Sequence, residues 1–203
     1  IRIHIRKCIP VAAGLAGGST DAAAVLYGMN QLFALKLTAK ELAQRGLTIG
    51  ADVPYCLMRG TALAEGIGEK LTRLPAVPRC PVVIAKPGIS VSTAWVYQHL
   101  VLDAQTQHPD INSLLKDIRK GDLQQMASPM GNLLEDVTIK EYPVIAHIKD
   151  FLNRHGALNA LMSGSGPTVF ALFEQLEDAR SAADALRESG LAKQIYVTTL
   201  FNV

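Results

Sequence analysis

The sequence predicts an α+β protein in two parts, with a ferredoxin-like sandwich in the C-terminal part. A glycine-rich loop near the start runs directly into an amphipathic helical segment. A proline cluster, made of Pro75, Pro78 and Pro81, then divides the chain. After it we expect a strand, several helices, a hairpin, a helix and a last strand, which is the element order of a ferredoxin-like fold.

The composition is that of a packed globular protein. Of the 203 residues, 49% are hydrophobic and 19% are charged, a balance that excludes a disordered chain. The formal net charge is +2 and there is no basic run, so we expect no nucleic-acid partner. No apolar run reaches the roughly 18 residues that a membrane-spanning helix needs, so we expect no membrane partner.

The three cysteines, Cys8, Cys56 and Cys80, are widely spaced and form no C-x-x-C pair. This pattern indicates neither a zinc site nor a disulfide framework. We therefore expect a cytoplasmic protein in which each cysteine is a small buried apolar residue.

The first segments are expected to be a strand and a long helix. Residues 1–6 alternate apolar and polar side chains, which predicts a half-buried strand. A helix is expected over about 19–35, with Ser19, Thr20 and Asp21 as N-cap candidates. Its apolar face, which we expect to lie in the core, comprises Ala22, Val25, Leu26, Met29, Leu32 and Phe33.

A second helix is predicted from Thr38 to Arg45, with a capping box between Thr38 and Glu41 and its end at Gly46. Asp52 follows between Gly50-Ala51 and Val53-Pro54, which indicates a fixed, non-helical or helix-starting backbone. Two short strands around a glycine turn are expected within residues 60–71.

In the C-terminal part we expect a strand at 81–86 and an amphipathic helix at 141–155, whose inward residues are Val144, Ile145, Ile148, Phe151 and Leu152. The remaining expected elements are helices near 90–99, 111–119 and 121–127, a strand at 157–162, a glycine turn at 163–167, a strand at 168–173, a helix at 177–188 and a strand at 194–201.

The glycine-rich loop has the chemistry of a phosphate cradle. Gly14, Gly17 and Gly18 let an anion approach the backbone closely. The free N–H groups of the following helical turn, with the positive end of the helix dipole, would bind the anion. The alternative is a tight turn that caps a core helix. The loop is neither a P-loop, because no Gly-Lys-Ser/Thr ending is present, nor a Rossmann site, because the glycine spacing differs.

Three features together resemble the GHMP small-molecule kinases over essentially the whole chain. They are the glycine loop, the segment Gly50-Ala51-Asp52-Val53-Pro54, and the second glycine turn Ser163-Gly164-Ser165-Gly166. The chain is most similar to the branch of this family that phosphorylates 4-diphosphocytidyl-2-C-methyl-D-erythritol in non-mevalonate isoprenoid (terpenoid) biosynthesis. The segment Gly131-Asn132-Leu133-Leu134-Glu135 also resembles that branch.

The resemblance implies a GHMP two-domain fold. Residues 1–78 would be the remainder of the N-terminal ATP-binding domain, with the ribosomal protein S5 domain 2-like fold. Residues 79–203 would be the C-terminal GHMP kinase domain. In this family roughly the first third of the chain holds a lysine that pairs with the catalytic aspartate, and no residue here matches it. We therefore expect either that the chain lacks an N-terminal portion and is inactive as it stands, or that the protein is a degraded relative.

The resemblance also implies an ATP- and Mg²⁺-dependent reaction. Asp52 matches the catalytic aspartate, which accepts or orients the proton of the substrate hydroxyl; the alternative is a structural Asp that caps a turn. Ser19 is the candidate Mg²⁺ ligand. The residues that match the nucleotide site are Lys7, Pro10, Gly14, Leu15, Ala16, Gly17, Gly18, Ser19 and Thr20. For Lys7, a solvated strand lysine is the alternative.

The small-molecule substrate is implied to meet four residues of the C-terminal part. Thr93 and Tyr97 match positions that contact the cytidine, and on a helix they would share a face; ordinary packing is the alternative for Tyr97. Gly164 and Ser165 belong to the second glycine turn, which would lie near the active cleft. Two other functions remain open: a GHMP kinase for another alcohol, of homoserine or mevalonate type, and a non-catalytic fold remnant that binds nucleotide or a protein partner.

Overall fold

The computed structural model describes residues 1–201, which form two compact units. The first unit contains residues 1–11 and 16–76, and the second contains residues 12–15 and 77–201.

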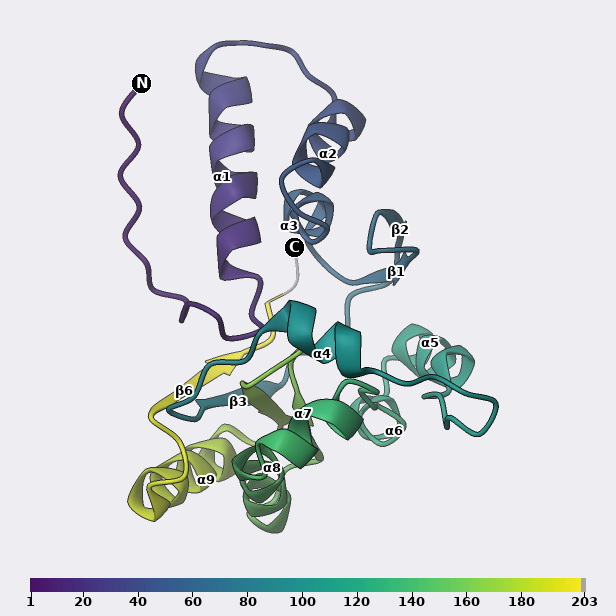
Figure 1. Cartoon of the computed structure of the whole chain (residues 1–203), viewed down its shortest axis with the longest axis vertical. Coiled ribbons are helices and arrows are strands. Elements are labelled where there is room, and N and C mark those ends of the chain that lie inside the picture. The colour runs from purple at the N-terminus through teal and green to yellow at the C-terminus, as the bar shows by residue number, and fades with distance from the viewer. Residues whose placement is uncertain (202–203) are drawn as a thin grey trace. The chain divides into compact units, whose positions relative to one another are not determined.

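The first unit consists of helices α1, α2 and α3 and a small hairpin. Both α1 and α2 pack on α3, as Figure 1 shows. The two hairpin strands are antiparallel, with Ala62 opposite Arg73, and confirm the two strands expected around a glycine turn. The elements are α1 (Gly17–Leu32), α2 (Ala39–Leu47), α3 (Val53–Met58), β1 (Ala62–Glu65) and β2 (Lys70–Arg73).

Helix α2 begins as predicted but ends later. The Glu41 N–H donates to the Thr38 hydroxyl at 3.3 Å, and the Thr38 N–H donates to the Glu41 carboxylate at 2.8 Å, which completes the capping box. The prediction that Gly46 ends this helix is wrong. Gly46 is buried inside it, and a Cβ there would lie 2.7 Å from Cγ1 of Val53. Its missing side chain is what lets α3 pack against α2.

The predictions for the first 35 residues need three corrections. The strand at 1–6 is not formed: residues 1–8 are exposed, and no strand in the described part of the chain pairs with them. Since a strand is defined by its partner, an alternating pattern alone does not make one. The predicted N-cap residues lie inside α1, and Leu32 and Phe33 are exposed instead of buried, at 73% and 48%.

The second unit contains a four-stranded antiparallel sheet in the order β4-β5-β3-β6. The first and third strands of the motif are therefore central, which confirms the ferredoxin-like fold. In this sheet Val83 of β3 lies opposite Ala171 of β5 and Val197 of β6. The strands are β3 (Pro81–Lys86), β4 (Asn159–Met162), β5 (Val169–Leu172) and β6 (Gln194–Thr199).

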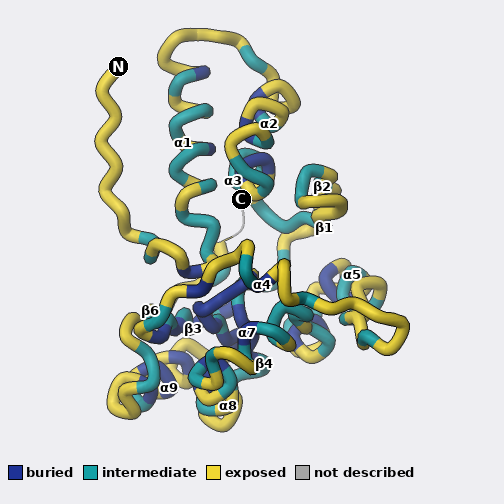
Figure 2. Tube along the Cα trace, in the orientation of Figure 1, coloured by how far each residue is buried: buried dark blue, intermediate teal, exposed yellow. Residues whose placement is uncertain are grey.

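Helices α8 (Val144–Arg154) and α9 (Leu176–Ser189) pack on this sheet and enclose the main core of the unit. Ile145, Ile148 and Leu152 of α8 are fully buried, as predicted. Buried residues lie along β3, β4 and β5 and at intervals along both helices, as the dark-blue stretches of Figure 2 show, whereas β6 has none. The remaining helices are α4 (Thr93–His99), α5 (Ile111–Lys120), α6 (Leu123–Ala127) and α7 (Glu135–Glu141), of which α7 was not predicted.

The three cysteines differ in how far they are buried. Cys80 is buried and Cys56 is half-buried, but Cys8 is exposed, so the expectation that every cysteine is buried is wrong for Cys8.

Within residues 1–201, no helix has the length and apolar character needed to cross a bilayer.

Candidate active site

The first half of the glycine-rich loop belongs to the second unit, where it lies against the second glycine turn. The hydroxyl of Ser163 donates to the carbonyl oxygen of Gly14 at 2.8 Å. Gly14 has a φ of +70°, and a Cβ on it would lie 2.2 Å from the carbonyl oxygen of Ser163. Only glycine fits this position, because both the left-handed backbone and the close approach exclude a side chain.

The second half of the loop forms the start of α1, in the first unit. Its N-cap is Ala16, in left-handed backbone with φ 48°, and no side chain caps the helix. The first helical hydrogen bond runs from the Thr20 N–H to the Ala16 carbonyl at 2.9 Å. The N–H groups of Gly17, Gly18 and Ser19 therefore precede the hydrogen-bonded ladder and are free to bind an anion.

Space and charge around this helix start also suit an anion. A Cβ on Gly18 would meet no atom within 4 Å, so the backbone there is open to approach. The first turn of α1 carries no acidic residue. Lys7 forms an ion pair with Asp21, and its Nζ lies 3.5 Å from where a Cβ on Gly17 would stand. The ammonium group thus lies beside the start of the helix, where the Asp21 carboxylate balances its charge.

Asp52 is the N-cap residue of α3, which confirms the helix-starting backbone. Its side chain makes no capping hydrogen bond and is exposed, so the structural alternative, a turn-capping aspartate, has no support. Gly50, two residues earlier, brings this segment close to α1: a Cβ there would lie 3.9 Å from the hydroxyl oxygen of Ser19. The Asp52 side chain thus makes no hydrogen bond to the helix that it begins, and the segment that carries it lies close to Ser19 at the start of α1.

The β1–β2 turn lies against the other side of the Asp52 segment. A Cβ on Gly68 would lie 3.5 Å from the carbonyl oxygen of Ala51. Within this turn the Glu69 carboxylate accepts the N–H of Ile67 at 2.7 Å. Hydrogen bonds from backbone N–H groups lower the pKa of Glu69 below its usual value. The turn is thereby held in one shape behind the aspartate.

Two of the predicted substrate residues meet in the second unit. The hydroxyl groups of Thr93 and Ser165 lie 2.8 Å apart and share a hydrogen bond. Ser165 is buried, whereas Tyr97, one turn after Thr93 on α4, is 60% exposed. An exposed aromatic ring of this kind offers a surface on which a flat ligand can stack. Gly164 is exposed and has a φ of +56°.

Sequence reasoning assigned no role to Asn132 and Glu135, which contact the second glycine turn. Asn132 donates from Nδ2 to the carbonyl oxygens of Met162 and Gly164, at 2.9 and 2.8 Å. Glu135 accepts the N–H of Met162 at 2.7 Å. About thirty residues separate these partners along the chain, so no local pattern could have revealed the contacts.

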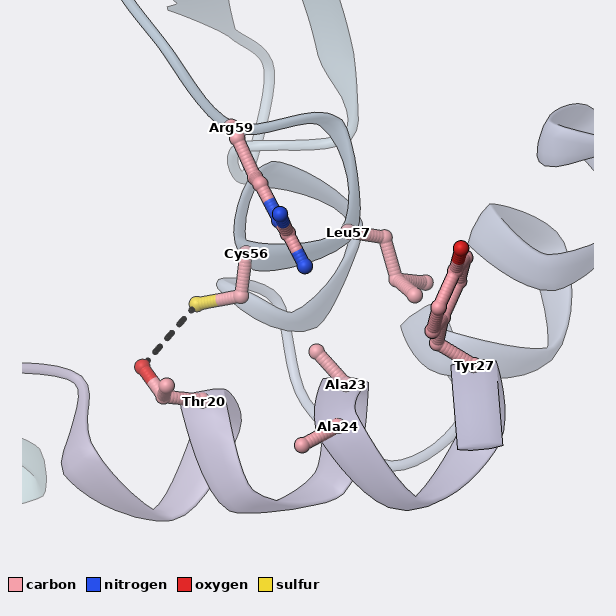
Figure 3. A pocket seen from close by; sticks show the side chains of 7 residues that line it. All are labelled: Thr20, Ala23, Ala24, Tyr27, Cys56, Leu57 and Arg59. Carbon is pink, nitrogen blue, oxygen red and sulfur yellow. Dashed lines mark hydrogen bonds between the residues drawn. The ribbon is translucent and has the colours of Figure 1, made fainter. Parts of the chain in front are cut away.

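A cavity of about 330 Å³ opens between α1 and α3 in the first unit (Figure 3). At one end the Thr20 hydroxyl and the Cys56 thiol lie 3.6 Å apart, and Tyr27 lies at the other. The cavity is lined by Thr20, Ala23, Ala24, Tyr27, Cys56, Leu57 and Arg59. It places a thiol next to the last residue of the predicted phosphate loop.

Comparison with known proteins agrees with this geometry. Residues 1–60 match the GHMP kinase N-terminal domain, and residues 114–191 match the GHMP kinase C-terminal domain. The 4-diphosphocytidyl-2-C-methyl-D-erythritol kinase of Lachnospira eligens is 54% identical over 201 residues, which are 99% of this chain and 70% of that relative. This chain belongs to the GHMP kinases. The kinase of the same name from Lachnoclostridium phytofermentans is also 54% identical, over 98% of this GHMP kinase and 68% of the relative.

Solved structures support the same family assignment. A crystal structure of 4-(cytidine 5'-diphospho)-2C-methyl-D-erythritol kinase matches this GHMP kinase with a TM-score of 0.81 at 34% identity, over 98% of this chain and 70% of the other. The homoserine kinase of Cytophaga hutchinsonii matches with a TM-score of 0.76 at 23% identity, over 97% and 68%. At that identity, the homoserine kinase shares the fold alone.

Proposed function

We propose that this GHMP kinase transfers the γ-phosphate of ATP to a hydroxyl of 4-diphosphocytidyl-2-C-methyl-D-erythritol, in non-mevalonate isoprenoid biosynthesis. One observation carries the substrate: relatives with that kinase name are 54% identical over nearly the whole chain. ATP is the phosphate donor of the kinase family to which the chain belongs. The contacts of the glycine loop and of the Asp52 segment support the residue roles that we propose.

The nucleotide phosphates are proposed to bind at the start of α1. The uncapped N–H groups of Gly17, Gly18 and Ser19 fit an anionic group, and Gly18 leaves room for its approach. Backbone donors held in this way stabilise charge on a transferring phosphoryl group without reorganising. The other proposed nucleotide residues flank them: Lys7, Pro10, Gly14, Leu15, Ala16 and Thr20.

Asp52 is proposed as the catalytic base. Its exposed carboxylate, which makes no capping hydrogen bond, can accept a hydrogen bond from the substrate hydroxyl and take its proton during attack on the γ-phosphorus. Holding the hydroxyl in line with the phosphoryl group is the second contribution of this carboxylate, since phosphoryl transfer depends mainly on positioning.

Mg²⁺ is proposed to bind through the Ser19 hydroxyl. Ser19 is the third residue of α1 and lies next to the segment that contains Asp52. Within residues 1–201, no group of three acidic, cysteine or histidine side chains could hold a metal by itself. One hydroxyl ligand fits an ion that keeps phosphate oxygens and water as its other ligands, which is how Mg²⁺ is usually bound in kinases. The bound ion would neutralise charge on the phosphates.

The cytidine is proposed to contact Thr93 and Tyr97, whose exposed ring offers a stacking surface. Gly164 and Ser165 are proposed to line the same substrate site. We also propose that residues 1–78 belong to the ATP-binding domain and residues 79–203 to the C-terminal domain, whose last two residues lie outside the described part. The exposed free thiol of Cys8 supports a reducing, cytoplasmic location.

The test is ADP release by the purified full-length protein with 4-diphosphocytidyl-2-C-methyl-D-erythritol, homoserine or mevalonate as the acceptor, with and without Mg²⁺. The proposed function predicts turnover with the cytidine compound alone, and only with the metal. A preference for homoserine or mevalonate would contradict the substrate and leave the family unchanged.

A further inference from the structure

Asn132 and Glu135 hold the second glycine turn entirely through its backbone. The two donors of the Asn132 amide are both used, on the carbonyl oxygens of Met162 and Gly164. The Glu135 carboxylate accepts a hydrogen bond from the N–H of Met162 at 2.7 Å. Three hydrogen bonds therefore fix the chain between the end of β4 and the turn, whatever side chains the turn carries.

Both side chains are themselves held in place. The Oδ1 atom of Asn132 accepts the N–H of Leu134 at 3.0 Å, so every polar atom of this amide group is paired. Glu135 forms an ion pair with Lys149 of α8, and the two side chains are only 13% and 18% exposed. A carboxylate shielded from water in this way is a rigid hydrogen-bond acceptor.

The second glycine turn also fixes the position of Gly14, the first glycine of the loop. Ser163 donates to the Gly14 carbonyl, and a Cβ on Gly14 would lie 2.2 Å from the Ser163 oxygen and 3.1 Å from that of Gly166. With no free space at this contact, any shift of the turn must shift Gly14 as well.

We propose that Asn132 and Glu135 are positioning residues for the nucleotide site, acting on Gly14 through the turn 163–166. The proposal rests on the proposed kinase function. Neither residue needs to touch the nucleotide. Their role is to keep the loop within the small tolerance that in-line phosphoryl transfer requires.

The chain offers a matched control for this test. Asn159 also donates from Nδ2 to two backbone carbonyls, of Ala127 and Met130, at 2.8 and 3.4 Å, and it is half-buried like Asn132. Asn132→Asp and Asn159→Asp each replace two donors by a carboxylate oxygen facing carbonyl groups. Only the first substitution disturbs the turn.

The experiment measures both ADP-release kinetics and backbone amide exchange in the two variants. Asn132→Asp should raise the KM for ATP on the order of tenfold and should speed exchange in peptides that cover residues 10–16 and 160–168. Asn159→Asp should leave both measurements near those of the parent. Glu135→Gln keeps the acceptor for the Met162 N–H but loses the ion pair with Lys149, so it should show the same pattern more weakly. It takes the place of Asn132→Asp if that variant does not fold.

Equal effects of Asn132→Asp and Asn159→Asp would overturn the proposal, as would unchanged exchange of residues 10–16. If the parent protein phosphorylates none of the three alcohols, the proposed function fails. The exchange comparison still decides whether Asn132 holds the loop.

Discussion

Asp52 and the loop glycines show how single residues shape this site. An aspartate at a helix N-cap usually accepts a hydrogen bond from a backbone N–H of the first turn. The side chain of Asp52, at the N-cap of α3, makes no such hydrogen bond. In the loop, Ala12 and Ala16 adopt left-handed backbone with φ of 50° and 48°. Each such alanine costs on the order of 1 kcal/mol relative to ordinary backbone, so the loop in which the phosphate is proposed to bind carries backbone strain.

Asp52→Asn should lower kcat by at least about a hundredfold, the scale of a lost general base, and leave the KM for ATP nearly unchanged. The amide keeps the shape of the side chain but cannot take a proton. Steady-state ADP release measures both constants. Asp178→Asn, at an exposed position in the first turn of α9, serves as the control for the loss of one negative charge. A kcat within a few-fold of the parent would remove Asp52 from the mechanism.

Gly14→Ala should lower the free energy of unfolding by about 2–4 kcal/mol, since left-handed backbone and overpacking each add a cost. The new methyl would lie 2.2 Å from the carbonyl oxygen of Ser163. Gly18→Ala is the matched variant, because its methyl meets no atom. It should change stability by no more than about 1 kcal/mol, in the stabilising direction expected for alanine in a helix. Urea unfolding of the two variants measures the difference, and equal destabilisation would contradict it.

At the scale of elements, the start of α2 was predicted correctly and its end was not. The capping box of α2 was predicted because its partners, Thr38 and Glu41, are three residues apart and need nothing else. The end of that helix was predicted wrongly, because Gly46 serves the contact with α3 rather than a cap. The strand at 1–6 failed for a similar reason: a strand depends on a partner that its own residues do not specify.

Thr38→Ala should cost about 1 kcal/mol of stability, the usual loss for an N-cap hydroxyl. The substitution removes the acceptor for the Glu41 N–H at the start of α2. Amide exchange within Ala39–Leu47 measures the local loss. Thr38→Ser, which keeps the hydroxyl, should behave like the parent; a loss as large as that of Thr38→Ala would show that the methyl group matters instead.

The same capping box predicts a pH dependence. Hydrogen bonds from the Thr38 N–H and then the Thr38 hydroxyl hold the pKa of Glu41 below its ordinary value near 4.5. A depressed carboxylate pKa stabilises the folded helix at neutral pH, and this contribution is lost as the pH falls through the folded pKa. Exchange in α2 should therefore differ between the parent and Glu41→Gln at pH 7, and the difference should fade as the pH falls below 4.5. A constant difference would contradict this origin.

At the scale of the whole molecule, the two units differ in how much apolar surface they bury. The second unit has a continuous core beneath α8 and α9, whereas the first buries few apolar side chains, among them Ala23, Leu42 and Val53. Regions with fewer buried contacts open at lower free energy. We expect the first unit to unfold before the second.

Labelling of Cys56, in the first unit, and of Cys80, in the second, measures the difference in stability between the two units. Burial raises the pKa of Cys80 to about 11, so only about one thiol in a thousand is ionised at pH 8. Alkylation of the native protein should label the exposed Cys8 first, then Cys56, and Cys80 last. In rising urea, Cys56 should become reactive at a lower concentration than Cys80, as peptide mass spectrometry would show. Simultaneous labelling of both would mean that the chain unfolds as one unit.

The sequence alone determined the features that depend on neighbouring residues: the capping box, the glycine-rich loop, the helix start at Asp52, and the element order that specifies the ferredoxin-like fold. Tertiary structure decided the contacts between distant segments. Only packing brought Ser163 to Gly14, Asn132 and Glu135 to the second glycine turn, and Ser165 to Thr93. The physical reason is that caps and turns are satisfied within a few residues, whereas a hydrogen bond between distant segments depends on how the whole unit packs.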